Sequence, residues 1–157
     1  MSEAGGRPPR IAVVADDLIW ATRLVELVRR AGAEPVPVRR PADLAAALAG
    51  AAGAVVDTSG RVIDPIAALV AARAASVPSL AVAPHDDPAL RRDAVAAGAS
   101  RVVPYRALHE RGDRELARWL AEVGVAVGPA STSPGPAASP GPAVTPAASP
   151  GSAEAIS

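Results

Sequence analysis

The chain has 157 residues, no cysteine and a formal net charge of zero, which excludes disulfides and thiol chemistry. No apolar run approaches the ~18 residues needed to cross a bilayer, and the start lacks the charged-then-apolar order of a signal peptide, so we expect a cytoplasmic protein without a membrane partner. The basic residues are all arginines, spread along the chain, and only Trp20, Tyr105 and Trp119 are aromatic; direct nucleic-acid binding, which needs a basic groove with stacking platforms, is not expected.

Five short apolar segments that end in turn residues alternate with helix-like segments. They predict strands at residues 11–15, 34–38, 54–57, 80–83 and 102–104. Such alternation is typical of an α/β fold with an open, doubly wound parallel sheet. Pro35 and Pro37 cannot donate to a strand ladder, so we expect the second strand at an edge of the sheet.

The segments between the strands predict five helices, at residues 18–31, 42–49, 64–74, 88–97 and 114–123. In the first, apolar residues recur at helical spacing from Trp20 to Ala31 and define a core-facing side. Asp16 or Asp17 can cap its N-terminus, and Gly32 can end it. The last carries Leu116 and Trp119 on one side.

The composition changes after Val127. Residues 133–138 (Ser-Pro-Gly-Pro-Ala-Ala) are nearly repeated at 139–144, and Glu154 is the one charged residue from Gly128 onward. Such a segment buries too little to offset chain entropy, so we expect a disordered tail with polyproline character. The predicted organisation is a flexible leader at 1–9, one domain at 10–127 and this tail at 128–157.

Acidic residues stand at the ends of two predicted strands. Asp57 closes the third strand, and Asp16 and Asp17 follow the first. Parallel sheets bind ligands and react at the carboxyl ends of their strands, so these carboxylates mark the candidate site.

This pattern resembles the receiver domain of two-component response regulators. Gly32 ends the first helix as in that family, Asp64 follows Asp57 by seven residues, and residues 93–99 (Asp-Ala-Val-Ala-Ala-Gly-Ala) are similar to the family's close of the fourth helix. The resemblance covers roughly residues 10–125. It implies a flavodoxin-like sheet with strand order 2-1-3-4-5.

The resemblance also implies roles for single residues. Asp57 is at the position of the phosphoacceptor. Asp16, Asp57 and the carbonyl of Ser59 are at the positions that hold Mg²⁺, a hard cation that prefers oxygen ligands. No cofactor is certain from these matches, and Mg²⁺ is the one they imply.

Three of the departures from the family pattern lie at the site. Ala15 replaces the first acid, Ala83 replaces the Ser or Thr that follows a phosphoryl oxygen, and Tyr105 replaces the lysine after the fifth strand. A neutral phenol supplies no positive charge to a phosphoryl group. Arg106 is adjacent and is the candidate surrogate.

We therefore expect a stand-alone signalling module, not an enzyme, that acts by protein–protein interaction without phosphorylation. The expected partner is a histidine kinase or a downstream signalling protein, bound on the face of residues 88–97, 102–104 and 114–123; this face could also form a homodimer. The alternative is a receiver phosphorylated on Asp57 in a phosphorelay. A second alternative, a small flavodoxin-like enzyme or nucleotide-binding module, lacks a glycine-rich fingerprint and any lysine for a P-loop; His85 is its isolated candidate base.

Overall fold

The computed structural model describes residues 6–129. The strands form the predicted five-stranded parallel sheet, with the order β2-β1-β3-β4-β5. The strands are β1 (Arg10–Val14), β2 (Glu34–Val38), β3 (Gly53–Asp57), β4 (Ser79–Ala83) and β5 (Arg101–Pro104). The expectations for the leader at 1–9 and the tail at 128–157 fall largely outside the described residues.

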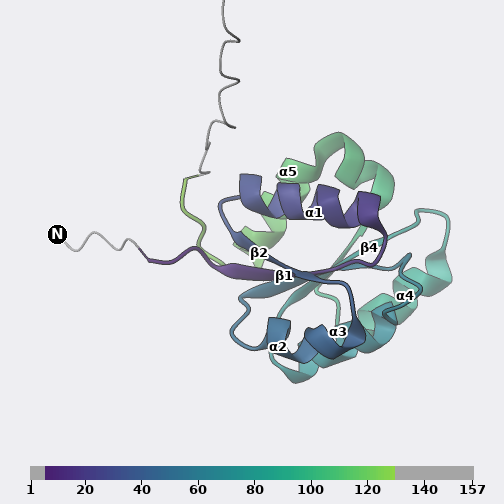
Figure 1. The fold of residues 1–157 in the computed structure, drawn as a ribbon. Coiled ribbons are helices and arrows are strands. Elements are labelled where there is room, and N and C mark those ends of the chain that lie inside the picture. The colour runs from purple at the N-terminus through teal and green to yellow at the C-terminus, as the bar shows by residue number, and fades with distance from the viewer. Residues whose placement is uncertain (1–5, 130–157) are drawn as a thin grey trace, which may run out of the picture.

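Helices cover both faces of the sheet, as Figure 1 shows. The helical elements are α1 (Leu18–Arg30), a 3-10 turn at Pro41–Asp43, α2 (Leu44–Leu48), α3 (Pro65–Ala74), α4 (Pro88–Ala97) and α5 (Tyr105–Glu122). α1 and α5 lie on one face, and α2, α3 and α4 lie on the other. This doubly wound arrangement buries both sides of the strands.

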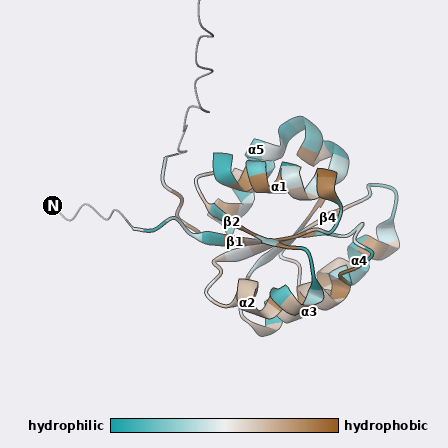
Figure 2. Cartoon of the chain, viewed as in Figure 1, coloured by the Kyte–Doolittle hydropathy of each residue, from teal (hydrophilic) through white to brown (hydrophobic). Residues whose placement is uncertain are grey.

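Each face of the sheet contributes to its own apolar core. On the α1–α5 side, Trp119 is fully buried beside Val13 and Val55. On the other side, Leu69 packs with Val14 and Val56. Because successive side chains of a strand point to opposite faces, neighbouring valines supply the two cores. Figure 2 shows the resulting apolar strands between helices of mixed polarity.

The two prolines of β2 lie at the edge of the sheet, as predicted. β2 pairs with β1 alone, with Pro35 opposite Ile11 and Pro37 opposite Val13. Proline has no N–H for a second neighbour, so this strand ends the sheet.

Aspartate side chains cap three helices. Asp17 accepts a hydrogen bond from the N–H of Trp20, Asp64 accepts from Ile66 and Ala67, and Asp87 accepts from Leu90. The sequence left Asp16 and Asp17 as alternative caps of α1, and the structure selects Asp17. Asp16 is thereby free for another role.

The last helix begins nine residues earlier than the sequence indicated. α5 starts at Tyr105 rather than Arg114 and contains one non-helical residue, Arg111, with φ −141° and ψ 31°. The segment before this kink lacks the apolar periodicity that predicts a helix, because much of it faces solvent. The helix expected at 42–49 is likewise divided into the 3-10 turn and α2.

No helix within residues 6–129 combines the length and the apolar character required to span a lipid bilayer.

Candidate functional site

Asp57 lies at the centre of the carboxyl edge of the sheet and is 2% exposed. It is the last residue of β3, the middle strand, and pairs with Val82 of β4. Its Oδ1 accepts hydrogen bonds from the N–H and the hydroxyl of Ser59, both at 3.0 Å, and its Oδ2 accepts from the same hydroxyl at 2.9 Å. Ser59, two residues after Asp57, therefore supplies donors to both oxygens of the carboxylate.

Tyr105 supplies a further donor to the same oxygen. Its hydroxyl donates to Oδ1 of Asp57 and accepts from the N–H of Ser59 at 3.1 Å. Tyr105 comes directly after β5, so the strand end carries its phenol to the acidic group. Its ring also packs against Trp20 of α1, with centroids 4.6 Å apart and a tilt of 51°.

The phenol stays protonated at neutral pH. Burial, and then the hydrogen bond to Asp57, raise the pKa of Tyr105 to about 12. An ionised phenol would place a second negative charge beside the carboxylate, which disfavours ionisation. Tyr105 is thus a neutral hydrogen-bond donor at the position where the receiver pattern has a cation.

Asp16 faces the loop between β3 and α3. Its Oδ2 accepts hydrogen bonds from three successive N–H groups, those of Arg61 at 2.8 Å, Val62 at 2.5 Å and Ile63 at 3.0 Å. Partial burial would raise the pKa of Asp16, but these bonds outweigh it and lower the pKa below its ordinary value of 3.8. Asp16 therefore fixes the loop that follows the Asp57–Ser59 segment.

The remaining predicted site residues contribute no polar group to this cluster. Ala15 and Ala83 are buried methyl side chains at the ends of β1 and β4. Arg106 points to solvent, with an 81% exposed side chain, and its Nε pairs with Glu110 at 2.9 Å. Because Tyr105 and Arg106 are consecutive residues of a helix, about 100° separates their directions, and Arg106 does not contact Asp57 in this structure.

The carboxylates as arranged do not fit a magnesium site. One oxygen of Asp16 and both oxygens of Asp57 accept hydrogen bonds, so these oxygens have fewer lone pairs left for Mg²⁺, which demands near-octahedral oxygen coordination. Within residues 6–129, no three His, Asp or Glu side chains are grouped closely enough to hold a metal ion together. The substitution of an acid by Ala15 is one reason.

The other candidate site residues, His85 and the aspartates beside it, lie apart from this cluster. His85 is exposed on the turn after β4, and the nearby Asp87 caps α4. Within the described part of the chain, neither joins the Asp57 cluster.

Two contacts of the site were not foreseen from the sequence. The hydroxyl of Thr58, 8% exposed, donates to the carbonyl of Val82 at 2.7 Å and ties β3 to β4 beside Asp57. The bond between Tyr105 and Asp57 is the other. The position of Tyr105 directly after the fifth strand was the sequence signal for this bond, because a tyrosine side chain there can reach the end of the middle strand.

No protein-family model matches the sequence, and no curated protein matches it significantly. Solved structures match its fold. The receiver domain of a sensor histidine kinase from Pseudomonas aeruginosa, with magnesium in its active-site cleft, has a TM-score of 0.61 at 19% identity and covers 73% of this chain and 98% of that one. A chemotaxis protein CheY4 from Vibrio cholerae has a TM-score of 0.59 at 18% identity, with coverages of 74% and 98%.

A third match is described as a putative response regulator from Chloroflexus aurantiacus; its TM-score is 0.64 at 18% identity, with coverages of 74% and 98%. Together with the strand order, these matches show that the chain has the receiver-domain fold of response regulators. The fold that the sequence resemblance implied is confirmed.

Proposed function

We propose that this chain is a receiver-fold signalling module that works by binding another protein and does not require phosphorylation of Asp57. The observation that carries the proposal is the hydrogen bond from the Tyr105 hydroxyl to Oδ1 of Asp57. It puts a neutral phenol on one of the two oxygens that could attack a phosphoryl donor.

Phosphoryl transfer to a carboxylate depends on positioning and on charge neutralisation by cations. Here the acceptor is buried and hydrogen-bonded, and the positions for an acid and a cation hold Ala15 and Tyr105. Arg106 would have to leave Glu110 and rotate around the helix to substitute for the missing cation. These features favour binding over phosphorelay chemistry.

The partner face that we propose consists of α4, β5 and α5. Val95 of α4 is 58% exposed, an apolar residue without a covering element. Nearby, Arg101 of β5 bridges Glu115 and Glu122 of α5 at 2.9 and 2.8 Å, which holds the strand and the helix in a fixed arrangement. A rigid face with a central apolar residue suits a protein partner, whether a kinase, a downstream protein or a second copy.

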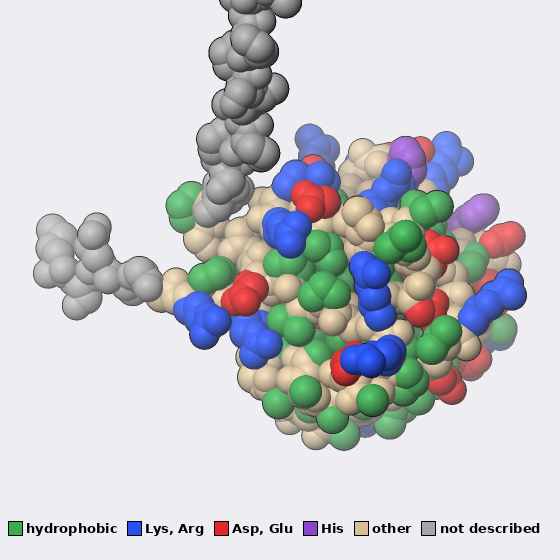
Figure 3. Space-filling model, viewed as in Figure 1, with side chains coloured by type: hydrophobic (Ala, Val, Ile, Leu, Met, Phe, Trp, Pro, Cys, Tyr) green, Lys and Arg blue, Asp and Glu red, His purple; other side chains and the backbone are tan. Residues whose placement is uncertain are grey.

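Nucleic acid remains an unsuitable partner. Figure 3 shows cationic and anionic side chains interspersed over the visible face, without a continuous basic stripe. This matches the formal net charge of zero.

Phosphorylation is tested directly by incubating the protein with acetyl phosphate and Mg²⁺ and recording its intact mass. We expect no added phosphoryl group on the native chain or on Asp57→Ala. The double variant Ala15→Asp, Tyr105→Lys, which supplies the two missing charges, should acquire one on Asp57. A modified native chain whose modification disappears in Asp57→Ala would overturn the proposal.

Magnesium binding is tested by fluorescence, because Trp20 contacts Tyr105 and so reports on the site. Titration with Mg²⁺ should leave the emission of the native chain unchanged. A saturable change that Asp57→Ala removes would show that the carboxylates rearrange to accept the ion.

The binding face is tested with two matched variants, Val95→Asp on α4 and Val70→Asp on α3, where the native valines are 58% and 51% exposed. We expect Val95→Asp to abolish capture of the partner from the native cell, and Val70→Asp to leave it intact. If Val70→Asp reduced capture more than Val95→Asp, the partner would bind on another face.

A further inference from the structure

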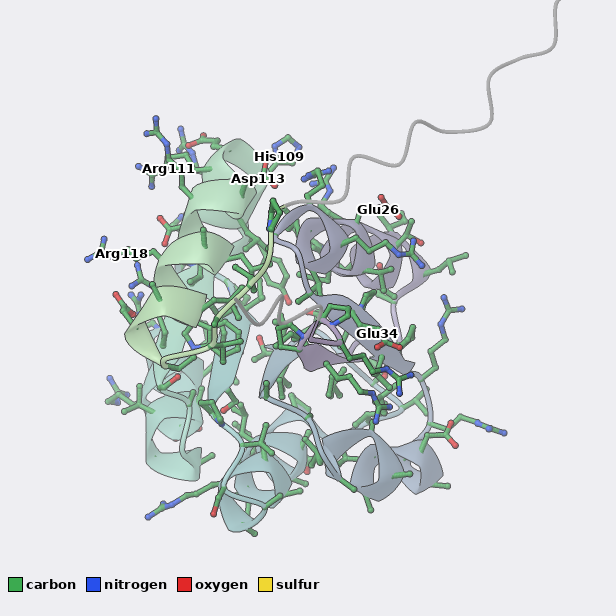
Figure 4. All side chains as sticks on the ribbon, turned by 90° about the vertical axis from the view of Figure 1, so that its left-hand side faces the viewer. Glu26, Glu34, His109, Arg111, Asp113 and Arg118 are labelled. Atoms are coloured by element: carbon green, nitrogen blue, oxygen red, sulfur yellow. The ribbon has the colours of Figure 1, made fainter. Side chains whose placement is uncertain are left out.

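A groove of about 1070 Å³ runs between α1 and the N-terminal half of α5. Its lining includes Ile19, Thr22 and Glu26 of α1 and His109, Arg111 and Asp113 of α5. In Figure 4, which looks along α1, the labelled His109 and Asp113 lie on the part of α5 next to that helix. At the end of α1, Arg30 pairs with Asp113 at 2.9 Å and closes one side of the groove.

An aromatic hollow lies beside one end of this groove. It is lined by Trp20, Tyr105 and Arg106, and His109 and Glu110 line both the hollow and the groove. Trp20 and Tyr105 are each half-buried, and the Arg23 guanidinium lies 5.3 Å from the Trp20 ring. The hollow beside the groove thus presents two tilted rings with a cationic donor nearby.

The described chain leaves the domain at the opposite end of α1. Gly32, with φ +85°, follows α1, and a Cβ on it would lie 2.4 Å from the carbonyl oxygen of Gly128. Only a glycine allows this approach, and it places residues 127–128 against the C-terminal end of α1. Figure 1 shows the chain passing α1 there. Residues 127–128 therefore lie at the end of α1 where Arg30 borders the groove.

The sequence beyond residue 129 has a spacing that suits the groove. Pro134, Pro140 and Pro146 recur every six residues. Polyproline II has three residues per turn, so six residues are two turns and these prolines would share one face. From Pro129 to Pro134 such a chain covers about 16 Å at 3.1 Å per residue, and α1 covers about 15 Å from Arg30 back to Trp20.

We propose that residues 130–157 bind in the α1–α5 groove of their own domain, with a proline of the six-residue series on the Trp20 and Tyr105 rings. Proline-rich segments bind aromatic-lined grooves because the extended chain loses little entropy on docking. A segment docked in the polyproline II conformation would have no internal hydrogen bonds, so its carbonyl oxygens would be acceptors for the Arg23 guanidinium beside Trp20. The segment carries a single charge, Glu154, so it meets the mixed charges of the groove without repulsion.

This proposal extends beyond the function proposed above and stands whether or not Asp57 is phosphorylated. It makes the C-terminal segment an internal ligand that covers Tyr105 and competes with any protein that approaches α1 and the start of α5.

The absence of cysteine makes the test clean, because a single introduced cysteine carries the only spin label. The full-length ¹⁵N-labelled chain with Ala138→Cys carries a nitroxide, and amide and indole signals are compared in the oxidised and reduced states. We expect the Trp20 indole signal and the amides of Thr22 and His109 to lose more than half of their intensity. Val70 and Val95, on the opposite face, should keep theirs.

The matched control carries the same label with Pro134, Pro140 and Pro146 changed to alanine, which leaves the domain itself untouched. In it we expect the broadening at Trp20 to disappear, with a residual effect only near Gly32, where the chain leaves. Equal broadening in both chains, or none at Trp20 in either, would overturn the proposal.

A mixed sample separates a segment's own domain from a neighbour's. Spin-labelled ¹⁴N chain is added to unlabelled ¹⁵N chain, and docking in cis predicts no broadening of the ¹⁵N signals. Broadening at Trp20 in the mixture would show that the segment of a second copy occupies the groove, which also contradicts the proposal as stated.

Discussion

The Tyr105 hydroxyl donates a hydrogen bond to Oδ1 of Asp57, so the residue that follows β5 holds the carboxylate that closes β3. In the receiver pattern a lysine would stand at position 105 and offer a positive charge. The phenol donates a hydrogen bond but carries no positive charge. This hydrogen bond holds the acidic group in place.

Loss of this donor should destabilise the fold. Tyr105→Phe keeps the ring on Trp20 but leaves the buried Asp57 with one donor fewer, and we expect the free energy of unfolding to fall by about 1–2 kcal/mol. Urea denaturation at neutral pH measures the difference. Val70→Ala, at an exposed position, is the control and should change stability by no more than about 0.5 kcal/mol; equal effects of the two variants would contradict the structural role of the hydroxyl.

Alkaline titration of the phenol should reveal the bond independently. Tyr105 is the only tyrosine, so tyrosinate absorbance reports on it alone, and we expect a midpoint near pH 12 rather than the ordinary 10.0. Since the folded-state pKa is raised, the stabilisation is fully present below pH 10.0 and is lost as the pH rises through about 12. Asp57→Asn should lower the midpoint only in part, because burial is the larger cause. An unshifted native midpoint would mean that the phenol is open to water.

Asp16 should stabilise the loop after Ser59 in a pH-dependent manner. Its folded-state pKa lies below 3.8, so its contribution is present above that pH and is lost as the pH falls through the lower folded-state value. We expect Asp16→Asn to be less stable than the native chain at neutral pH and to approach it in strong acid. Denaturation curves at the two extremes measure this, and a constant difference across the range would assign the effect to packing instead of charge.

The approach of Gly128 to Gly32 should make Gly32→Ala unusually destabilising. Gly32 and Gly124 both have positive φ, at +85° and +74°, but a Cβ meets the Gly128 carbonyl at the first and nothing within 4 Å at the second. Gly124→Ala should lower the free energy of unfolding by about 1 kcal/mol through backbone strain alone. Gly32→Ala should exceed it, and thermal unfolding of the pair isolates the clash. If the two losses were equal, residues 127–128 would not lie against α1 in solution.

The fold could be predicted from the sequence because its signals are local. Apolar segments indicate the strands, and the prolines at 35 and 37 indicate which strand lies at the edge. The capping aspartates indicate where helices begin. The site was harder, because its contacts join residues far apart in the chain. Asp57 was found as a strand end, but the position of Asp16 depends on the backbone of residues 61–63, which no side-chain pattern specifies. The early start of α5 was missed because its first turns are largely exposed and carry few apolar positions.

The kink at Arg111 divides α5 into two mechanical parts. The first carries Tyr105 and, through it, the state of the Asp57 carboxylate; the second is anchored by the fully buried Trp119. A displacement of the Tyr105 end of α5 can therefore be taken up by bending at Arg111. The part of α5 that pairs with Arg101 then keeps its position.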